Sequence, residues 1–242
     1  MYLISDKRLE KFKNLYSKKR CFIVGNGPSL EFNNLNKLEN EYVFVTGWFA
    51  FHKDYQFLKN IFYCLGAAPI WWRGSLYSLL YNSITINKNI LLFAESSFLP
   101  LNIKYRYFPK DKIYYLTLID GKRDGSNISG NIINPIELGS NAVQDIMLPI
   151  AYYMGFRDIY LLGCDCTIGT DWEHFHFYDI ALMPFEMMRQ INSCSNGFNL
   201  KELELSYIKF KKFFEDNNRK IHNSTNGGNL EVFDRVDYDS LF

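Results

Sequence analysis

The sequence predicts an α/β fold with a mostly parallel sheet, contained in a single domain. Short, continuous apolar runs end at glycine or polar residues, and amphipathic segments with helical spacing lie between some of them. The 242 residues suit one such domain, because single α/β domains often reach about 250 residues. Hydrophobic residues make up 48% of the chain and charged residues 22%, enough to bury a substantial core. We therefore expect one domain over 1–242.

The first segment, residues 1–19, is charged and is predicted to form a peripheral helix with Leu9, Phe12 and Leu15 on one side. It has no apolar core followed by a small-residue cleavage site, so no signal peptide is expected. The chain also lacks a run of about 18 uncharged apolar residues of the kind that spans a membrane. Its five cysteines are odd in number and sparse, which favours a reducing, cytoplasmic location.

Seven segments are predicted to be strands of a parallel sheet, and the first six are apolar runs of the kind that is buried on both faces. They cover residues 21–24, 42–45, 61–65, 90–93, 113–116, 159–162 and 220–222. The clearest helix precedes Gly155, with a cap at Ser140 or Asn141 and a kink at Pro149. A second helix is predicted at about 200–216. Residues 120–139 have little apolar content and are predicted to be a long surface loop.

Ligands of an open parallel sheet bind where the strands end, so the loops after the strands are the candidate sites. The strongest signal is Gly25-Asn26-Gly27-Pro28-Ser29, directly after the first strand. Its glycines allow a close approach of the backbone, and its N–H groups could receive a phosphate. The same pattern also fits an ordinary strand-to-helix turn with Pro28 at the first helical position.

Further polar residues follow other predicted strands or precede the first helix. The predicted nucleotide contacts therefore also include Ser140, Asn141, Asp165, Asn223, Ser224 and Thr225. Asp165 could hold a ribose hydroxyl, order a loop or cap the turn after its strand. The last three residues are also common turn formers, which leaves a purely structural role open for them.

Two of the four histidines, His174 and His176, lie close together, and either could act as a general base near neutral pH. One of them packing and the other facing solvent is the structural alternative. Cys164 and Cys166 with the two histidines would supply four zinc ligands, but one residue between paired cysteines is atypical spacing. We therefore expect no metal site.

The amino-acid composition limits the classes of binding partner that we expect. The net charge of +1 argues against a dedicated nucleic-acid binder. Aromatic residues make up 17% of the chain, which suits a core but also suits stacking on sugars or bases. Lysines and aromatic residues mingle along the 200–216 helix, so peripheral association with the inner face of the membrane stays open, as does the oligomeric state.

Two landmarks carry a resemblance to known families. Residues 22–30, Phe-Ile-Val-Gly-Asn-Gly-Pro-Ser-Leu, look like the start of the bacterial sialyltransferases of glycosyltransferase family forty-two. Residues 155–165, Gly-Phe-Arg-Asp-Ile-Tyr-Leu-Leu-Gly-Cys-Asp, resemble their second landmark. The chain resembles more closely a related bacterial family of capsule and surface-glycan synthesis, which includes archaeal hydroxymethyl-dihydropterin pyrophosphokinase. That likeness extends to residues 176–179, the helix near 205–215 and the ending at 227–242.

The resemblance implies a Rossmann-like three-layer fold that binds a CMP-sugar without a metal. It implies that Asn26 contacts the nucleotide, the 140–141 region its ribose or phosphate, and a histidine the acceptor hydroxyl. The sequence departs from the sialyltransferases at Gly47 and Cys64, where they carry asparagines. It also departs at 166–168, where they carry tyrosines.

We therefore expect an inverting glycosyltransferase that moves a sugar from a nucleotide donor to a hydroxyl of a carbohydrate or glycolipid acceptor in surface-polysaccharide assembly. No cofactor is expected for that reaction. One alternative is an enzyme that transfers pyrophosphate from ATP, for which Mg²⁺ would clamp the phosphates. The other is a non-catalytic partner of a polysaccharide synthase.

Overall fold

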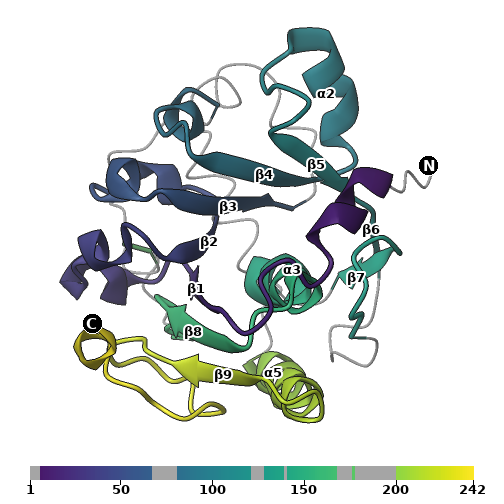
Figure 1. Ribbon diagram of the computed structural model, residues 1–242. Helices are drawn as coiled ribbons and strands as arrows, with labels where there is room; N and C mark the ends of the chain where they lie inside the picture. The colour runs from purple at the N-terminus through teal and green to yellow at the C-terminus, as the bar shows by residue number, and fades with distance from the viewer. Residues whose placement is uncertain (1–5, 67–80, 121–127, 139–140, 168–175, 178–199) are drawn as a thin grey trace.

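The computed structural model describes residues 6–66, 81–120, 128–138, 141–167, 176–177 and 200–242. Within these ranges, a seven-stranded parallel sheet lies between two layers of helices (Figure 1). The sheet contains β1 (Arg20–Val24), β2 (Tyr42–Thr46), β3 (Asn60–Leu65), β4 (Ile90–Glu95), β5 (Ile113–Leu116), β8 (Asp158–Leu162) and β9 (Lys220–Asn223). The helices are η1 (Lys7–Phe12), η2 (Pro28–Phe32), η3 (Leu35–Leu38), η4 (Phe49–Phe51), η5 (Tyr55–Phe57), α2 (Phe98–Tyr105), η7 (Val143–Met147), α3 (Leu148–Met154), α5 (Leu200–Glu215) and η10 (Asp239–Leu241).

The strand order is β5-β4-β3-β2-β1-β8-β9, and every neighbouring pair is parallel. The chain builds outward from β1 in one direction to β5, then returns to place β8 on the other side of β1. This reversal makes the gap between β1 and β8 the topological switch point, where the loops after the two strands diverge and ligands of such sheets bind. The expected three-layer α/β architecture is confirmed.

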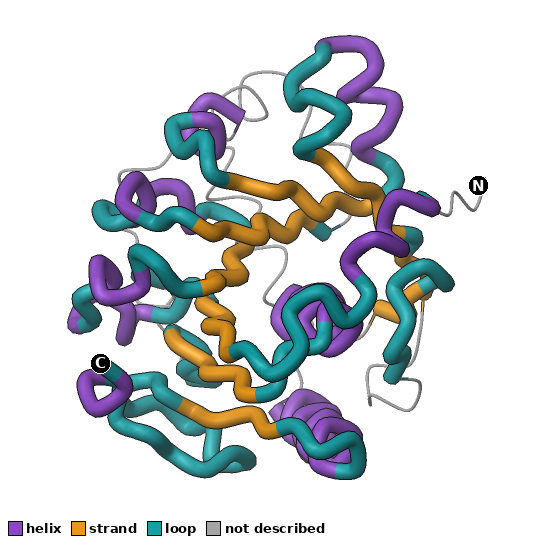
Figure 2. Tube along the Cα trace, in the orientation of Figure 1, coloured by secondary structure: helices purple, strands orange, loops and turns teal. Residues whose placement is uncertain are grey.

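The two faces of the sheet bury separate cores, because alternate residues of each strand point to opposite sides. One core packs η1, η7, α3 and α5 against side chains such as Ile23, Phe44 and Leu161. The other packs the short 3-10 helices η2 to η5 against side chains such as Phe22, Val45 and Tyr63. The tube in Figure 2 shows the same division, with α3 and α5 on one side of the orange strands and the short 3-10 helices on the other.

The N-terminal segment differs from the expected helix. It forms only the 3-10 helix η1, in which Leu9 and Phe12 are buried while Leu15 is 55% exposed. Asn14 has a φ of 55°, so the chain leaves the helical direction before Leu15 can join the buried side.

Residues 120–139 are also less loop-like than expected. Strand β7 (Ile136–Leu138) pairs in parallel with β6 (Leu118–Asp120) in a small second sheet, and Ile132 and Ile136 are buried in the α3-side core. A surface loop is therefore wrong for the described part from 128 to 138, because its isoleucines cover an apolar face.

The central helix starts with a π turn, in which the Leu148 N–H donates to the carbonyl of Val143. Pro149 follows at the first turn of α3. The wide turn accommodates a residue with no N–H to donate, so the expected irregularity at Pro149 falls just before it. Within the described residues, no helix is both long and apolar enough to cross a bilayer.

Asp6 joins η1 to the edge strand β5. Its carboxylate accepts hydrogen bonds from Arg8 Nε (2.8 Å), Arg8 Nη2 (2.6 Å) and the Tyr115 N–H (3.1 Å). Burial alone would raise the pKa of Asp6, but the Arg8 and Tyr115 hydrogen bonds outweigh it and lower that pKa. The edge strand is thus tied to the N-terminal segment by an ionised carboxylate.

We expect Asp6→Ala to lower the free energy of unfolding by about 1.5–3 kcal/mol, because it removes hydrogen bonds to a charged group. Since the pKa is lowered on folding, this contribution is present above the ordinary aspartate pKa and is lost as pH falls through the folded-state value. Urea unfolding at pH 7 and at pH 3 measures both effects. Glu10→Ala, an exposed acid in the same helix, is the control, and an equal loss there would contradict the assignment.

Candidate active site

The ends of β1 and β8 lie side by side at the switch point. The register pairs Val24 with Leu162, which places Gly25 beside Gly163. The Gly25 N–H donates to the Leu162 carbonyl (2.8 Å) and the Gly27 N–H to the Gly163 carbonyl (2.9 Å). A Cβ atom on Gly25 would lie 2.4 Å from the Gly163 oxygen, so glycine is needed for this approach of the two backbones.

The expectation that the N–H groups of the Gly25–Ser29 loop receive a phosphate is wrong for most of the loop. Gly25 and Gly27 donate to β8 and to its loop, and the Ser29 N–H faces Asp165 Oδ1 at 3.3 Å. Pro28 has no N–H, and it starts the 3-10 helix η2, as expected from its alternative role. The physical reason is proximity, because the neighbouring strand end already offers acceptors to these amides.

Asp165 orders this loop. Its side chain is 7% exposed, and Oδ2 accepts a hydrogen bond from Ser29 Oγ at 2.9 Å. Burial raises the pKa of this carboxyl, while the Ser29 bonds oppose the rise. Gly27 packs directly against it, since a Cβ there would lie 1.7 Å from Oδ2. Of the three roles considered for Asp165, the geometry displays loop ordering, and nucleotide contact stays a prediction.

Asn26 is the loop residue that the structure leaves with an available side-chain acceptor. Its Nδ2 donates to the Thr46 carbonyl at 3.2 Å, which fixes the orientation of the amide. Its Oδ1 is buried and, among the described residues, has no hydrogen-bond partner. A buried acceptor without a partner is costly, and a ligand that donates an N–H or O–H would remove that cost.

The main-chain oxygen of Asn26 holds His176. It accepts from the Phe177 N–H (3.0 Å) and lies 3.2 Å from His176 Nδ1. A carbonyl can only accept, so Nδ1 carries the proton and Nε2 carries the lone pair. Burial lowers the pKa of His176, with the Asn26 carbonyl opposing, so the ring is neutral at pH 7. His174 lies outside the described residues.

The residues at and just after the end of β9 are buried, and some of their side chains form hydrogen bonds with main-chain groups. Asn223 Nδ2 donates to the Leu230 carbonyl (2.6 Å), and its Oδ1 accepts from the Thr225 N–H (3.0 Å). Thr225 Oγ1 accepts from the Cys164 N–H at 3.1 Å, which ties this turn to the end of β8. Ser224 Oγ is buried without a hydrogen-bond partner among the described residues.

Asn141 caps the central helix, as expected, through the Gln144 N–H, which donates to Asn141 Oδ1 at 3.1 Å. Gln144 Nε2 donates to the Leu203 carbonyl of α5 at 3.1 Å. Ser140 lies outside the described residues. The Asn141 side chain also hydrogen-bonds with Tyr207, so Asn141 lies beside α5.

The nearby thiols are not nucleophiles. Burial raises the pKa of Cys164 well above its ordinary value and that of Cys166 to about 12, so both stay protonated at neutral pH. Within the described part of the chain, no group of three or more histidine, cysteine or acidic residues has the geometry to hold a metal.

The sequence alone did not reveal how Thr46 and His52 contribute to the candidate active site. Thr46 follows a predicted strand, but its contribution is a main-chain oxygen, which leaves no trace in the residue type. His52 is buried, and its ring contacts that of Phe177 at 5.0 Å. Burial lowers the pKa of His52. The His52 ring packs against Phe177, the residue next to His176.

We expect Gly27→Ala to destabilise the protein by about 2 kcal/mol or more, because the added methyl displaces the Asp165 carboxylate from Ser29. Gly66→Ala is the matched control at the end of β3, where the new Cβ would meet Ile146 at an ordinary 3.6 Å. Its stability should change by about 0.5 kcal/mol or less. Thermal and urea unfolding of both variants measure this difference, and equal losses would contradict the packing described for Gly27.

No known family model matches the sequence, and no curated protein matches it. Solved structures do match the fold. An alanine-for-asparagine variant of the sialyltransferase CST-II in complex with CMP superposes with a TM-score of 0.54 at 17% identity, covering 90% of this chain and 86% of that chain. CstII from Campylobacter jejuni in complex with the substrate analogue CMP-3FNeuAc gives a TM-score of 0.51 at 16% identity, with the same coverage of 90% and 86%.

A glycosyltransferase named MAf, from Magnetospirillum magneticum AMB-1, gives a TM-score of 0.54 at 12% identity. The match covers 97% of this chain but only 38% of that longer chain. At these identities the likeness establishes architecture, so this chain has the α/β fold found in these glycosyltransferases.

Proposed function

We propose that the protein is a glycosyltransferase that moves a sugar from a nucleotide-activated donor, most suitably a CMP-sugar, to a hydroxyl group of a carbohydrate or glycolipid acceptor. One residue carries the proposal. Asn26 presents a buried Oδ1 at the switch point, which has no hydrogen-bond partner among the described residues, and it holds His176 through its main-chain oxygen. The fold shared with sialyltransferases solved in complex with CMP supports the same conclusion.

Asn26 is proposed to recognise the nucleoside by a hydrogen bond. Because Nδ2 is committed to Thr46, Oδ1 is held in one orientation as an acceptor. The exocyclic amine of cytosine and the ribose hydroxyls are donors that match it. The remaining predicted nucleotide contacts are Gly25, Gly27, Pro28, Ser29, Ser140, Asn141, Asp165, Asn223, Ser224 and Thr225. Of these, Ser224 has support of its own, because its buried hydroxyl is also unpartnered among the described residues.

His176 is proposed to be the general base, with His174 kept as the alternative. Its Nε2 takes the proton of the acceptor hydroxyl while the hydroxyl oxygen bonds to the anomeric carbon and the nucleotide leaves with the bonding electron pair. The Asn26 carbonyl stabilises the imidazolium that forms, since it accepts from Nδ1–H in both protonation states. A single displacement of this kind inverts the anomeric centre. We propose that it needs no metal.

We propose that this transfer belongs to surface-polysaccharide or glycolipid assembly at the cytoplasmic face of the membrane, which rests on the sequence resemblance to capsule-associated proteins. The pterin branch of the same resemblance suggests pyrophosphate transfer from ATP instead. That reaction requires a divalent cation on the phosphates, and the described residues supply no cluster of ligands for one. A non-catalytic partner of a synthase is the remaining alternative.

We expect CMP to stabilise the protein by roughly 2.7 kcal/mol at a concentration near 100 Kd, with or without magnesium. Asn26→Ala should weaken CMP binding about tenfold, because a hydrogen bond from the nucleoside is lost. Thermal shift and calorimetry measure both. Asn33→Ala, which alters a buried asparagine at the end of η2, is the control. Stabilisation by ATP with magnesium but not by CMP would favour pyrophosphate transfer, and silence from every nucleotide would favour the non-catalytic partner.

We expect His176→Gln to lower kcat by about 10²–10⁴-fold while CMP affinity stays unchanged. Since burial lowers the pKa of His176, the acidic limb of the rate profile should lie below the ordinary histidine pKa of about 6.5. The test is transfer from a CMP-sugar measured between about pH 5 and pH 8. His222→Gln, in the edge strand β9 where the His222 ring stacks on Tyr160 at 4.9 Å, should keep full activity. Full activity in both His176→Gln and His174→Gln would refute the assignment of the base.

A further inference from the structure

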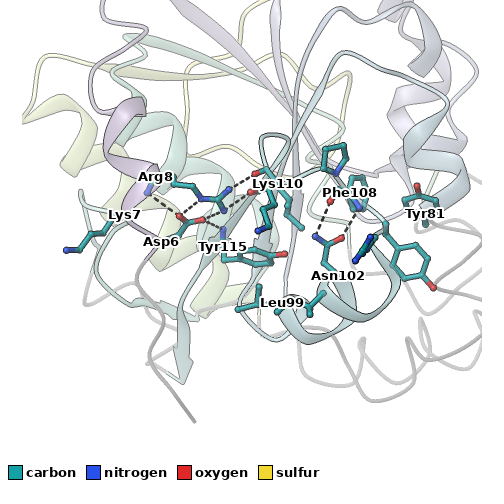
Figure 3. Close-up of a pocket in the computed structure, with 14 residues that line it drawn as sticks. Asp6, Lys7, Arg8, Tyr81, Leu99, Asn102, Phe108, Lys110 and Tyr115 are labelled. Carbon is teal, nitrogen blue, oxygen red and sulfur yellow. Dashed lines mark hydrogen bonds and ion pairs between the residues drawn. The ribbon is translucent and has the colours of Figure 1, made fainter.

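A cavity lies at the β5 edge of the sheet, away from the candidate active site. Its volume is about 1280 Å³, and it is enclosed by η1, α2, the turn at 106–110 and β5 (Figure 3). Strands β4, β3 and β2 separate β5 from β1, where Asn26 begins the candidate site. We call it the β5-edge cavity; its lining comprises Asp6, Lys7, Arg8, Tyr81, Leu99, Asn102, Ile103, Arg106, Tyr107, Phe108, Pro109, Lys110, Ile113 and Tyr115.

The charge of the β5-edge cavity is positive. The ion pair between Asp6 and Arg8 cancels one charge of each sign, and Arg8 also donates to the carbonyls of Lys110 and Ile113. The other charged residues of the lining are Lys7, Arg106 and Lys110, and all three are exposed. In the described ranges, no ion pair engages any of them. A concave surface with uncompensated cations attracts anions.

Three aromatic residues of the cavity lining form a row of contacting rings, which an exposed tyrosine outside the lining extends. The ring of Tyr105, 49% exposed, lies 5.2 Å from that of Tyr107, which lies 4.7 Å from Tyr81. Tyr81 in turn contacts the buried Phe108 at 5.3 Å. Figure 3 shows Tyr81 and Phe108 on one side of the cavity and Lys110 towards the other.

These features match one ligand chemistry. The C–H faces of pyranose rings pack on the electron-rich faces of aromatic rings, and tyrosine hydroxyls pair with sugar hydroxyls. Lysine and arginine bind carboxylates or phosphates by charge-assisted hydrogen bonds. An acyl chain would instead leave the phenolic groups beside hydrocarbon, which is unfavourable. The volume exceeds the usual 300–1,000 Å³ of small-molecule pockets, so more than one sugar unit fits.

We propose that the β5-edge cavity binds an acidic oligosaccharide, with Arg106 and Lys110 holding its anionic groups and Tyr81 and Tyr107 packing on its sugar faces. Such binding does not require the transfer reaction proposed above. Together with that reaction, it would retain an acidic glycan chain at a distance from the point of transfer.

Calorimetry with the full chain tests this proposal. The probes are hexagalacturonate, which carries carboxylates, and maltohexaose, which is neutral. We expect hexagalacturonate to bind about tenfold or more tightly than maltohexaose and to weaken as salt rises from about 0.05 to 0.5 M. Equal binding of the two sugars, or no binding of hexagalacturonate, would overturn the proposal. Vesicles of phosphatidylglycerol are the third probe, and binding to them without binding to hexagalacturonate would identify a lipid surface and overturn it too.

Variants localise the binding. Arg106→Asn combined with Lys110→Gln should weaken hexagalacturonate binding about tenfold or more. Asparagine is chosen because Arg106 has a φ of 53°, which asparagine tolerates. Lys18→Gln combined with Lys220→Gln removes the same charge from exposed positions outside the lining and should leave affinity unchanged. Equal weakening by both pairs would show nonspecific charge attraction and refute the site.

Tyr107→Leu should weaken hexagalacturonate binding while its salt dependence stays the same, because the ring contributes packing and no charge. Unchanged affinity in this variant would refute the role of the aromatic row. CMP binding, measured in every variant, should match that of the unaltered protein. If the unaltered protein does not bind CMP, the proposed transfer reaction is contradicted. The proposal for the β5-edge cavity is tested separately, by the binding of hexagalacturonate.

Discussion

The carbonyl oxygen of Asn26 is the contact on which the candidate site depends. It accepts from the Phe177 N–H and from His176 Nδ1, and so brings residues 150 positions apart in the chain to one point. The level ends of β1 and β8 make this contact available, because they hold the Asn26 loop against the Gly163 loop. Any shift of that loop therefore moves His176 together with the Asn26 side chain. In the proposed function, this one peptide unit would couple nucleotide binding to proton transfer.

The glycine loop serves a different purpose from an anion cradle. Its amides are used by the end of β8 and by Asp165, so the glycines permit close packing of two backbones. In the proposed site, recognition would pass from the main chain to the Asn26 side chain, whose Nδ2 donates to Thr46 and whose Oδ1 is an acceptor without a partner among the described residues. An acceptor discriminates among nucleosides through their N–H and O–H groups and repels phosphate oxygens. Such a site favours reading a base or ribose over gripping a phosphate.

Most of the aromatic side chains in the described residues pack in the two cores. Tyr16, Phe62 and Phe156 contact one another on the α3 side. On the other side, the ring of Tyr55 contacts those of Phe49 and Tyr63. Short 3-10 helices cover the second face, and large rings fill the space that longer helices would occupy. At the β5 edge, however, a row of rings reaches the surface beside Arg106 and Lys110, which form no ion pair in the described ranges, so composition alone could not separate core packing from sugar binding.

Sequence by itself determined the sheet. Each predicted strand lies within two residues of an observed one, because strands buried on both faces are continuous apolar runs that end where the chain must turn. It also offered the cap at Asn141 as one of two positions and the helix start at Pro28 as one of two readings of the glycine loop, because both features depend on neighbours a few residues away. Only the tertiary structure decided three other features. These are the direction of the Gly25 and Gly27 amides, the burial of Ile132 and Ile136, and the contact between Asn26 and His176. Each depends on a partner distant in the chain, usually a main-chain carbonyl, and a main-chain atom leaves no mark on residue type.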